Sequence, residues 1–251
     1  MPDLTEDVIM MTGASRGLGR SMAERFGAEG ARVVLTARDE ERLETVAANL
    51  PTESLVAPAD VRDADAVESV IDRTIERFGR IDALVNNAGV SLLGMTDSRR
   101  ELVDVSEDQW DTVLEVNLKG VFLFTRAALG HMYEQDGGAV INVSSGLGRT
   151  AVAGAGPYVS SKWGLEGLTR VIALEGEDRG VTANAVSPGG RVNTDIWAHL
   201  PADERESILQ PDVMDDAAVL LAAQGPDGVT GESLTAAEWE DRLGPSSSDQ
   251  T

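Results

Sequence analysis

The sequence predicts an α/β fold: a doubly wound parallel sheet in three layers (α/β/α), forming a single domain over residues 1–251. Short apolar runs alternate with amphipathic helical patterns, which is typical of a parallel sheet covered by helices on both faces. A glycine-rich turn follows the first apolar run, as in nucleotide-binding sheets of this class. The 251 residues are 42% hydrophobic, which is enough apolar material for one core of this size.

Each predicted strand is a short apolar run, as expected for strands that are buried on both faces. Six strands are expected, at residues 7–13, 31–37, 54–61, 81–89, 138–145 and 181–190.

Five helices are expected between these strands, at residues 19–30, 39–50, 63–79, 106–133 and 157–177. Their ends carry local signals. Gly30 suits the left-handed position after the first helix, and Pro51 ends the second. Asp63 can cap the third helix, and Pro157 fits the first turn of the fifth.

Two further segments are interpreted from their position and composition. Residues 195–214 follow the last predicted strand and are expected to cover a substrate. Residues 244–251, GPSSSDQT, have the composition of a disordered tail. The N-terminus lacks a basic start followed by an apolar run, and no stretch approaches the ~18 apolar residues of a membrane span, so we expect a cytoplasmic protein.

The chain is strongly acidic, with 43 acidic and 21 basic residues and a net charge of −22. Such a surface repels nucleic-acid phosphates and anionic lipids, so neither nucleic acid nor a membrane is expected as a partner. Only two residues are lysine, Lys119 and Lys162. Acid excess with so little lysine predicts a salt-adapted, halophilic protein rather than a moderately acidic enzyme. Without cysteine, and with His131 and His199 isolated, no metal site is expected.

A glycine loop, TGASRGLG, lies between the first predicted strand and helix. Its spacing, G-x-x-x-G-x-G, lets the chain turn tightly and lets a pyrophosphate approach the backbone at a helix N-terminus. The loop predicts dinucleotide binding through Gly13, Ser15, Arg16, Gly17, Leu18 and Gly19.

The choice between NADP and NAD depends on the end of the second predicted strand. An acid there would hold the ribose hydroxyls of NAD, but the chain has Ala37 followed by Arg38. An arginine can grip a 2′-phosphate bidentately, and Arg16 could reach the same phosphate. NADP is therefore expected as the cofactor. NAD stays open because Asp39 follows directly.

Tyr158 and Lys162 are four residues apart on a predicted helix and so face the same way. A cation ~4 Å away could lower the pKa of a tyrosine by up to ~3 units, while desolvation raises it. The pair is suited to general acid–base catalysis. A lysine in a chain that otherwise uses arginine indicates a compact point donor with a chemical task.

The chain resembles the short-chain dehydrogenase/reductase family over roughly residues 7–235. The resemblance rests on five motifs in the family's order: TGASRGLG, NNAG, NVSS, YVSSK and SPGG. It implies a Rossmann fold, an NAD(P)-dependent oxidoreductase and a homo-oligomer, either a dimer or a tetramer. The chain departs from the family in two places: PGGRVNT is one residue longer than the usual pattern, and SLTAAEWEDRLG stands where the family closes with Asp-Gly-Gly.

The resemblance implies roles for individual residues. Tyr158 would be the acid–base and Lys162 would bind the nicotinamide ribose. Ser145, rather than Ser144, would hold the carbonyl, and Asn117 would complete a proton relay. The cofactor contacts that it adds to the glycine loop and Arg38 are Asp60, Val61, Asn87, Ala88, Gly89, Val192 and Thr194.

These residues favour an enzyme that transfers a hydride between NADP(H) and a ketone or secondary alcohol of small size. Three alternatives stay open: a sugar-nucleotide epimerase, a catalytically silent NADP-sensing protein, and a subunit serving mainly in assembly. The substrate would be selected by residues 90–104 and 195–210, which follow the fourth and sixth predicted strands.

Overall fold

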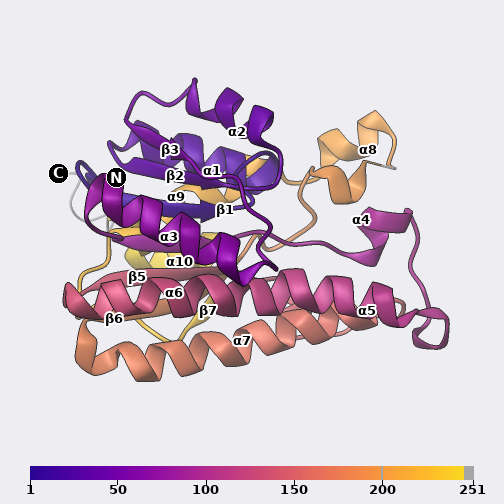
Figure 1. The fold of residues 1–251 in the computed structure, drawn as a ribbon. Helices are drawn as coiled ribbons and strands as arrows, with labels where there is room; N and C mark the ends of the chain where they lie inside the picture. Colours follow the sequence, from indigo (N-terminus) through magenta and orange to yellow (C-terminus); the bar gives the residue numbers. More distant parts are fainter. Residues whose placement is uncertain (199, 246–251) are drawn as a thin grey trace.

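The computed structural model describes residues 1–198 and 200–245. His199 and most of the predicted tail, residues 246–251, lie outside the described residues. Seven parallel strands form one sheet in the order β3-β2-β1-β4-β5-β6-β7 (Figure 1). The strands are β1 (Val8–Thr12), β2 (Arg32–Thr36), β3 (Ser54–Val56), β4 (Ala83–Asn86), β5 (Gly138–Val143), β6 (Val181–Ser187) and β7 (Ser233–Thr235).

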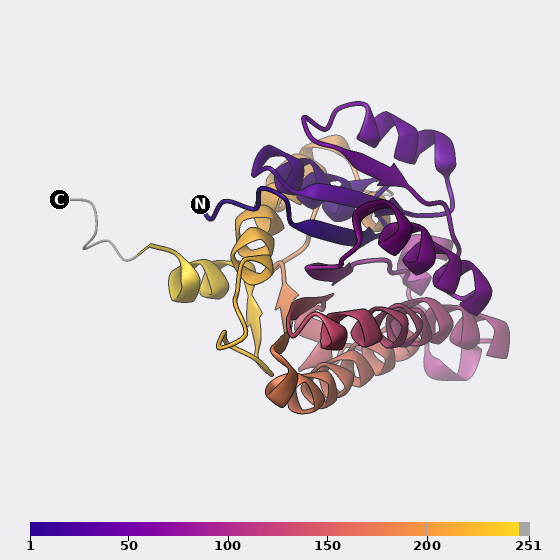
Figure 2. The same ribbon diagram turned by 60° about the vertical axis from the view of Figure 1, so that its left-hand side comes forward.

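Helices cover both faces of this sheet, which confirms the predicted three-layer arrangement. The helices are α1 (Gly17–Ala28), α2 (Glu40–Ala47), α3 (Ala64–Phe78), α4 (Leu92–Thr96), α5 (Glu107–Leu114), α6 (Gly120–Glu134), α7 (Gly156–Gly176), α8 (Ala202–Ser207), α9 (Asp215–Ala222) and α10 (Ala236–Leu243). One core cluster packs α1, α2, α9 and α10 against the sheet, and a second packs α3, α6 and α7 against the other face (Figures 1 and 2).

Several local signals act as predicted. Asp63 caps α3 by accepting hydrogen bonds from the N–H groups of Asp65 and Ala66. Gly30 follows α1 with a φ of 94°, and Pro157 lies in the first turn of α7. The predicted strand at residues 54–61 is shorter, because only Ser54–Val56 pairs with β2.

The prediction of six strands was one short. β7 pairs with β6, and Thr235 at its end opens α10 through a capping box with Glu238. Three residues are too few to show a strand period, which is why the sequence pattern did not reveal it.

The long helix predicted at residues 106–133 is continuous in the backbone but not uniform. α5 and α6 are joined by a π-helical turn, Glu115–Lys119, which contains Asn117. Such turns carry one extra residue and often lie at functional sites.

The parallel sheet brings the carboxyl ends of its strands to one edge. The glycine loop follows β1, Asn87–Gly89 follows β4, and Ser144 and Ser145 follow β5. Ligands of open α/β sheets bind in the crevice outside this edge. Among the described residues, no helix has both the length and the apolar content that crossing a bilayer requires.

Candidate active site

The glycine loop is held against the segment after β4. Gly13 has a φ of 68°, and a Cβ there would lie 2.9 Å from the Ala88 Cα atom. A Cβ at Gly19 would lie 2.2 Å from the carbonyl oxygen of Gly13. The Asn87 amide nitrogen donates to the carbonyl oxygens of Thr12 and Gly13, at 3.0 and 3.2 Å. Its amide nitrogen therefore shapes the loop, and a contact from Asn87 to a cofactor remains a prediction.

The N-terminus of α1 is open to a ligand. Arg16 is its N-cap residue, and no side chain of the described residues caps the helix there. The backbone N–H groups of the first turn, with the positive end of the helix dipole, fit a pyrophosphate. Ser15 lies in the turn just before the helix, and Leu18 lies in its first turn, partly packed on the core. This donor set fits a dinucleotide cofactor.

A second segment, which includes Thr194 and Asp195, contacts the glycine loop. Arg16 forms an ion pair with Asp195, and a Cβ at Gly17 would lie 3.2 Å from the Thr194 Cγ2 atom. Val192 is buried and bridges to Leu209. The structure thus brings Thr194 to the glycine loop, and the predicted contact of Thr194 with a cofactor stays a prediction. The pairing of Arg16 with Asp195 was not predicted, because the two residues are far apart in the chain.

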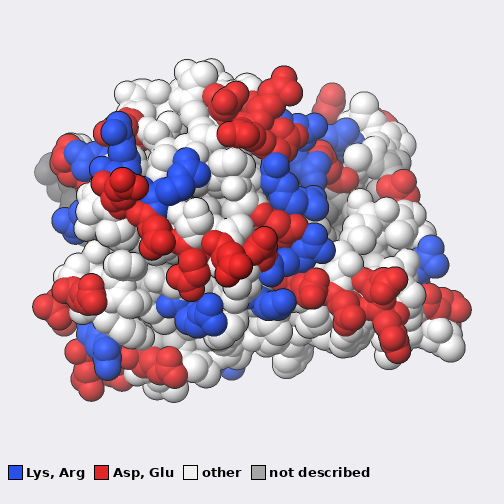
Figure 3. All heavy atoms as spheres, in the orientation of Figure 1, with Lys and Arg blue, Asp and Glu red and all other residues white. Residues whose placement is uncertain are grey.

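The predicted adenosine end of the site lies after β2 and β3. Arg38 is exposed and lies close enough to Asp60 to lower the pKa of that carboxyl. The hydrogen bond from Arg62, 2.6 Å between Nη2 and Oδ2, is the larger cause of that lowering. Val61 is buried and packs closely on Gly120, where a Cβ would lie 2.7 Å from the Val61 Cγ2 atom. Figure 3 shows basic side chains among acidic ones between α2 and α6.

Asn117 joins three parts of the site. Its Oδ1 accepts from the Val90 N–H at 2.8 Å, and its Nδ2 donates to the Val90 carbonyl oxygen at 2.9 Å. The same Nδ2 contacts the Ser161 hydroxyl at 3.1 Å, and that hydroxyl donates to the Tyr158 carbonyl oxygen at 2.8 Å. The fully buried Asn117 therefore fixes the segment after β4 to the helix that carries Tyr158 and Lys162.

Ser145, Tyr158 and Lys162 meet at the carboxyl end of β5. Lys162 is buried, donates to the Val143 carbonyl oxygen at 2.7 Å and lies 5.8 Å from the centre of the Tyr158 ring. Ser145 accepts from the Leu147 N–H at 3.2 Å and hydrogen-bonds to Tyr158. This arrangement favours Ser145 over Ser144 as the partner of Tyr158.

Burial is the largest cause of the pKa shifts of Tyr158 and Lys162. It raises the pKa of Tyr158, which the hydrogen bond with Ser145 opposes. Burial also lowers the pKa of Lys162 to about 8, and the charge of Glu166 opposes that lowering. Of the two effects expected for Tyr158, desolvation acts in this structure, and the cause that opposes it is the hydrogen bond with Ser145 rather than the charge of Lys162.

Glu166 was missed by the sequence reasoning. It is buried, and its Oε1 accepts hydrogen bonds from the hydroxyls of Ser144 and Ser233, at 2.5 and 2.9 Å. Its Oε2 is buried with no hydrogen-bond partner among the described residues. A glutamate four residues after Lys162, on the same helix face, was the available signal.

A pocket of about 120 Å³ opens beside Tyr158. Its walls come from both segments expected to select the substrate, since Leu92 and Arg99 belong to the first and Ile196 and Trp197 to the second. The remaining described lining residues are Ser91, Leu93, Leu147, Gly154, Ala155 and Pro157. Over residues 1–198 and 200–245, no cluster of three or more His, Cys, Asp or Glu side chains could hold a metal ion.

The sequence matches the short chain dehydrogenase family over residues 7–205. The chain belongs to this family. It is 36% identical over 241 residues to (2S)-[(R)-hydroxy(phenyl)methyl]succinyl-CoA dehydrogenase subunit BbsD of Thauera aromatica, covering 90% of this chain and 93% of that protein. It is 38% identical over 204 residues to the 3-oxoacyl-[acyl-carrier-protein] reductase FabG of Staphylococcus aureus, covering 80% of each.

Solved structures of other short-chain dehydrogenases share the fold. A candidate short-chain alcohol dehydrogenase from Sinorhizobium meliloti 1021 superposes with a TM-score of 0.81 at 32% identity, over 93% of this chain and 96% of that one. A candidate gluconate dehydrogenase from Agrobacterium tumefaciens gives 0.84 at 29% identity, over 93% and 95%. The chain is an oxidoreductase that acts on CH–OH or carbonyl groups, in a family that uses nicotinamide cofactors.

Proposed function

We propose that this short-chain dehydrogenase interconverts a ketone and a secondary alcohol with NADP(H), using Tyr158 as its acid–base. The observation that carries the proposal is the convergence of Ser145, Tyr158 and Lys162 at one end of a pocket, with Asn117 fixing their helix. The nicotinamide, when bound, supplies or accepts the hydride at the carbonyl carbon.

The protein residues handle the oxygen and its proton. In reduction, Tyr158 donates its proton to the carbonyl oxygen, while the Ser145 hydroxyl stabilises the developing negative charge. Lys162 holds a positive charge beside the tyrosinate that remains, and this favours release of the proton. Asn117 would complete a relay, through water, that supplies a replacement proton to this group. In oxidation the same groups act in reverse.

The cofactor is proposed to lie along the strand ends. Gly13, Ser15, Gly17, Leu18 and Gly19 would hold the pyrophosphate. Arg38, with Arg16, would hold the 2′-phosphate that distinguishes NADP from NAD. Asp60, Val61, Asn87, Ala88 and Gly89 would line the adenosine side, and Val192 and Thr194 the nicotinamide side. Support comes from the open N-terminus of α1 and from Thr194 packing on Gly17. A silent cofactor sensor is less supported, because it does not explain this complete set beside a pocket. A sugar-nucleotide epimerase is less supported, because the epimerase-type members of the family usually have longer chains and a different glycine spacing.

Substitution of Tyr158 with Phe tests the function. The variant should lose turnover of ketones with NADPH by more than about a hundredfold, because general acid catalysis is removed. Its dissociation constant for NADPH, measured by fluorescence titration, should stay within about twofold. Turnover within tenfold of the unmodified protein would overturn the assignment.

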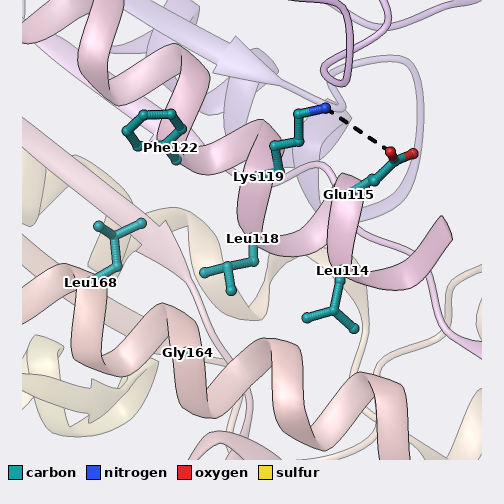
Figure 4. A pocket seen from close by; sticks show the side chains of 7 residues that line it. All are labelled: Leu114, Glu115, Leu118, Lys119, Phe122, Gly164 and Leu168. Carbon is teal, nitrogen blue, oxygen red and sulfur yellow. Dashed lines mark ion pairs between the residues drawn. The ribbon is translucent and has the colours of Figure 1, made fainter. Parts of the chain in front are cut away.

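We also infer a cytoplasmic, salt-adapted homo-oligomer of two or four copies. A groove between the α5–α6 helix and α7 is lined by Leu114, Leu118, Phe122 and Leu168, with the Lys119–Glu115 ion pair at its rim (Figure 4). On α6 and α7, Phe122, Trp163, Val171 and Leu174 are also exposed. A second copy that packs the same face on this one would cover these side chains. Light scattering that gives the mass of a monomer would contradict this.

A further inference from the structure

The pocket beside Tyr158 has a single charged wall. Of the described residues that line it, Arg99 alone is charged, and Leu92, Leu147, Pro157 and Ile196 supply apolar surface. The chain as a whole carries twice as many acidic as basic residues, 43 against 21. The positive charge of Arg99 in this pocket therefore contrasts with the negative net charge of the chain. Few polar groups in an apolar pocket orient its ligand and give it specificity.

Arg99 is fixed to the pocket wall by its backbone. Gly154 has a φ of 77°, and a Cβ there would lie 2.8 Å from the Arg99 Cβ atom. The N–H of Arg100 donates to the Gly154 carbonyl oxygen at 3.2 Å. The Arg99 Nη1 atom contacts the Ala153 carbonyl oxygen at 3.4 Å. These contacts join the segment after α4 to the loop before α7, and they place the guanidinium at their junction.

The Arg99 guanidinium has donors left for a ligand. Other arginines near the strand ends are paired, Arg16 with Asp195 and Arg62 with Asp60. The ion pairs between described residues do not include Arg99. A guanidinium offers five N–H donors in a planar fork, and the one contact above uses only one nitrogen. That fork matches the two oxygens of a carboxylate.

The rest of the pocket defines the other half of the ligand. Trp197 is a lining residue, and Arg191 lies over its ring, 4.9 Å from the centre. The leucine, isoleucine and proline side chains complete an apolar surface close to Tyr158. A phosphate carries more charge and more oxygens than the one arginine fork can match, and no other described lining residue is charged. A carboxylate needs only the arginine.

We infer that the substrate is a compact keto acid or hydroxy acid, with an aryl or alkyl group against Trp197 and a carboxylate bound by Arg99. This inference rests on the proposed function in one respect, that the ketone or alcohol carbon lies at Tyr158. The arginine also lowers the electrostatic cost of bringing an anion to a molecule with a charge of −22.

Binding of unreactive ligands tests the inference without turnover. The probes are 4-phenylbutanoate and its amide, titrated by calorimetry into the full-length protein at fixed ionic strength. The acid should bind about fivefold tighter than the amide or more, as for a partly exposed charge-assisted contact. Arg99→Gln should bring the two dissociation constants to within about twofold and leave that of the amide unchanged. Arg77→Gln, at the opposite end of the sheet, is the matched control and should keep the preference.

Turnover gives a second readout. The ratio of kcat/KM for 4-oxo-4-phenylbutanoate to that for its methyl ester should exceed about five, and should fall to about one in Arg99→Gln. Equal binding of acid and amide, binding of neither, or a preference that survives in Arg99→Gln would overturn the inference. The proposed function is tested separately. An absence of ketone turnover in the unmodified protein would overturn the proposed function, and it would not change the comparison of acid and amide binding.

Discussion

Lys162 and Glu166 lie four residues apart on α7, and each exposes only 5% of its surface. A buried carboxylate one turn away helps to keep the buried ammonium charged, because it opposes the lowering of its pKa to about 8. Glu166 also accepts from Ser144 and Ser233, so it ties the ends of β5 and β7 to the same helix.

Glu166→Gln should therefore lower the pKa of Lys162 below about 8. Lys162 would lose its proton at lower pH, and the basic limb of the kcat/KM profile should move to lower pH by about one unit. Gln keeps one acceptor for the two serines, so activity near pH 6 should change little. Glu175→Gln, an exposed change on the same helix, is the control. A basic limb that does not move in Glu166→Gln would show that Glu166 does not support the charge of Lys162.

The second prediction concerns the exposed Arg38 beside Asp60. Arg38→Asp should weaken NADPH binding by about tenfold or more and favour NADH, because an acid repels a 2′-phosphate and accepts from a ribose hydroxyl. Dissociation constants for both cofactors decide the matter. Arg77→Asp, which makes the same change of charge and also breaks the ion pair of Arg77 with Glu53, is the control. If the unmodified protein already binds NADH as tightly as NADPH, the proposed cofactor preference is wrong.

The third prediction concerns stability and pH. Partial burial raises the pKa of Asp215 from its ordinary value of 3.8 to about 7, and the hydrogen bond from Ser21 opposes this increase. The folded state then holds a proton that the unfolded chain has released. The contribution of Asp215 to stability is thus full below about pH 4 and is lost as the pH rises to about 7.

Asp215→Asn removes this titration. At pH 8 the variant should be more stable by about 1–2 kcal/mol, a figure reduced for the partial exposure of the group, and at pH 4 the difference should be small. Urea unfolding at the two pH values measures it. Asp216→Asn, at the next position and paired with Arg25, should not show this dependence. An equal effect of Asp215→Asn at both pH values would contradict the prediction.

The fourth prediction concerns salt. With a net charge of −22, dilute buffer should expose strong self-repulsion in the folded state. At ~1 M salt the screening length falls to ~3 Å, so the melting temperature should rise markedly in molar KCl. Sucrose at matched osmolality should raise it much less. A flat KCl curve, or an equal rise in sucrose, would mean that the acidic surface serves solubility and not salt adaptation.

The features that the sequence predicted have local signals. An apolar run followed by glycines at fixed spacing identifies β1 and its loop, and Asp63 and Pro157 mark helix starts within a few residues. Contacts that join distant parts of the chain could not be predicted in this way. The pairing of Arg16 with Asp195, the use of the Asn87 amide by the glycine loop, and the anchoring of Glu166 by Ser233 all depend on tertiary packing. β7 escaped detection because its three residues are too few to show a strand period, so that only its pairing with β6 defines it.

The π-helical turn at Glu115–Lys119 sets the phase between α5 and α6. Each residue of an α-helix advances by about 100°, so the extra residue of this turn shifts everything before it by that angle relative to everything after it. Deleting one residue here would restore a uniform helix at little cost to its own hydrogen bonds. It would also rotate Asn117 out of line with either Val90 or Ser161, which it now contacts together. The exact number of residues in this helix therefore determines the geometry of the site as much as its side chains do.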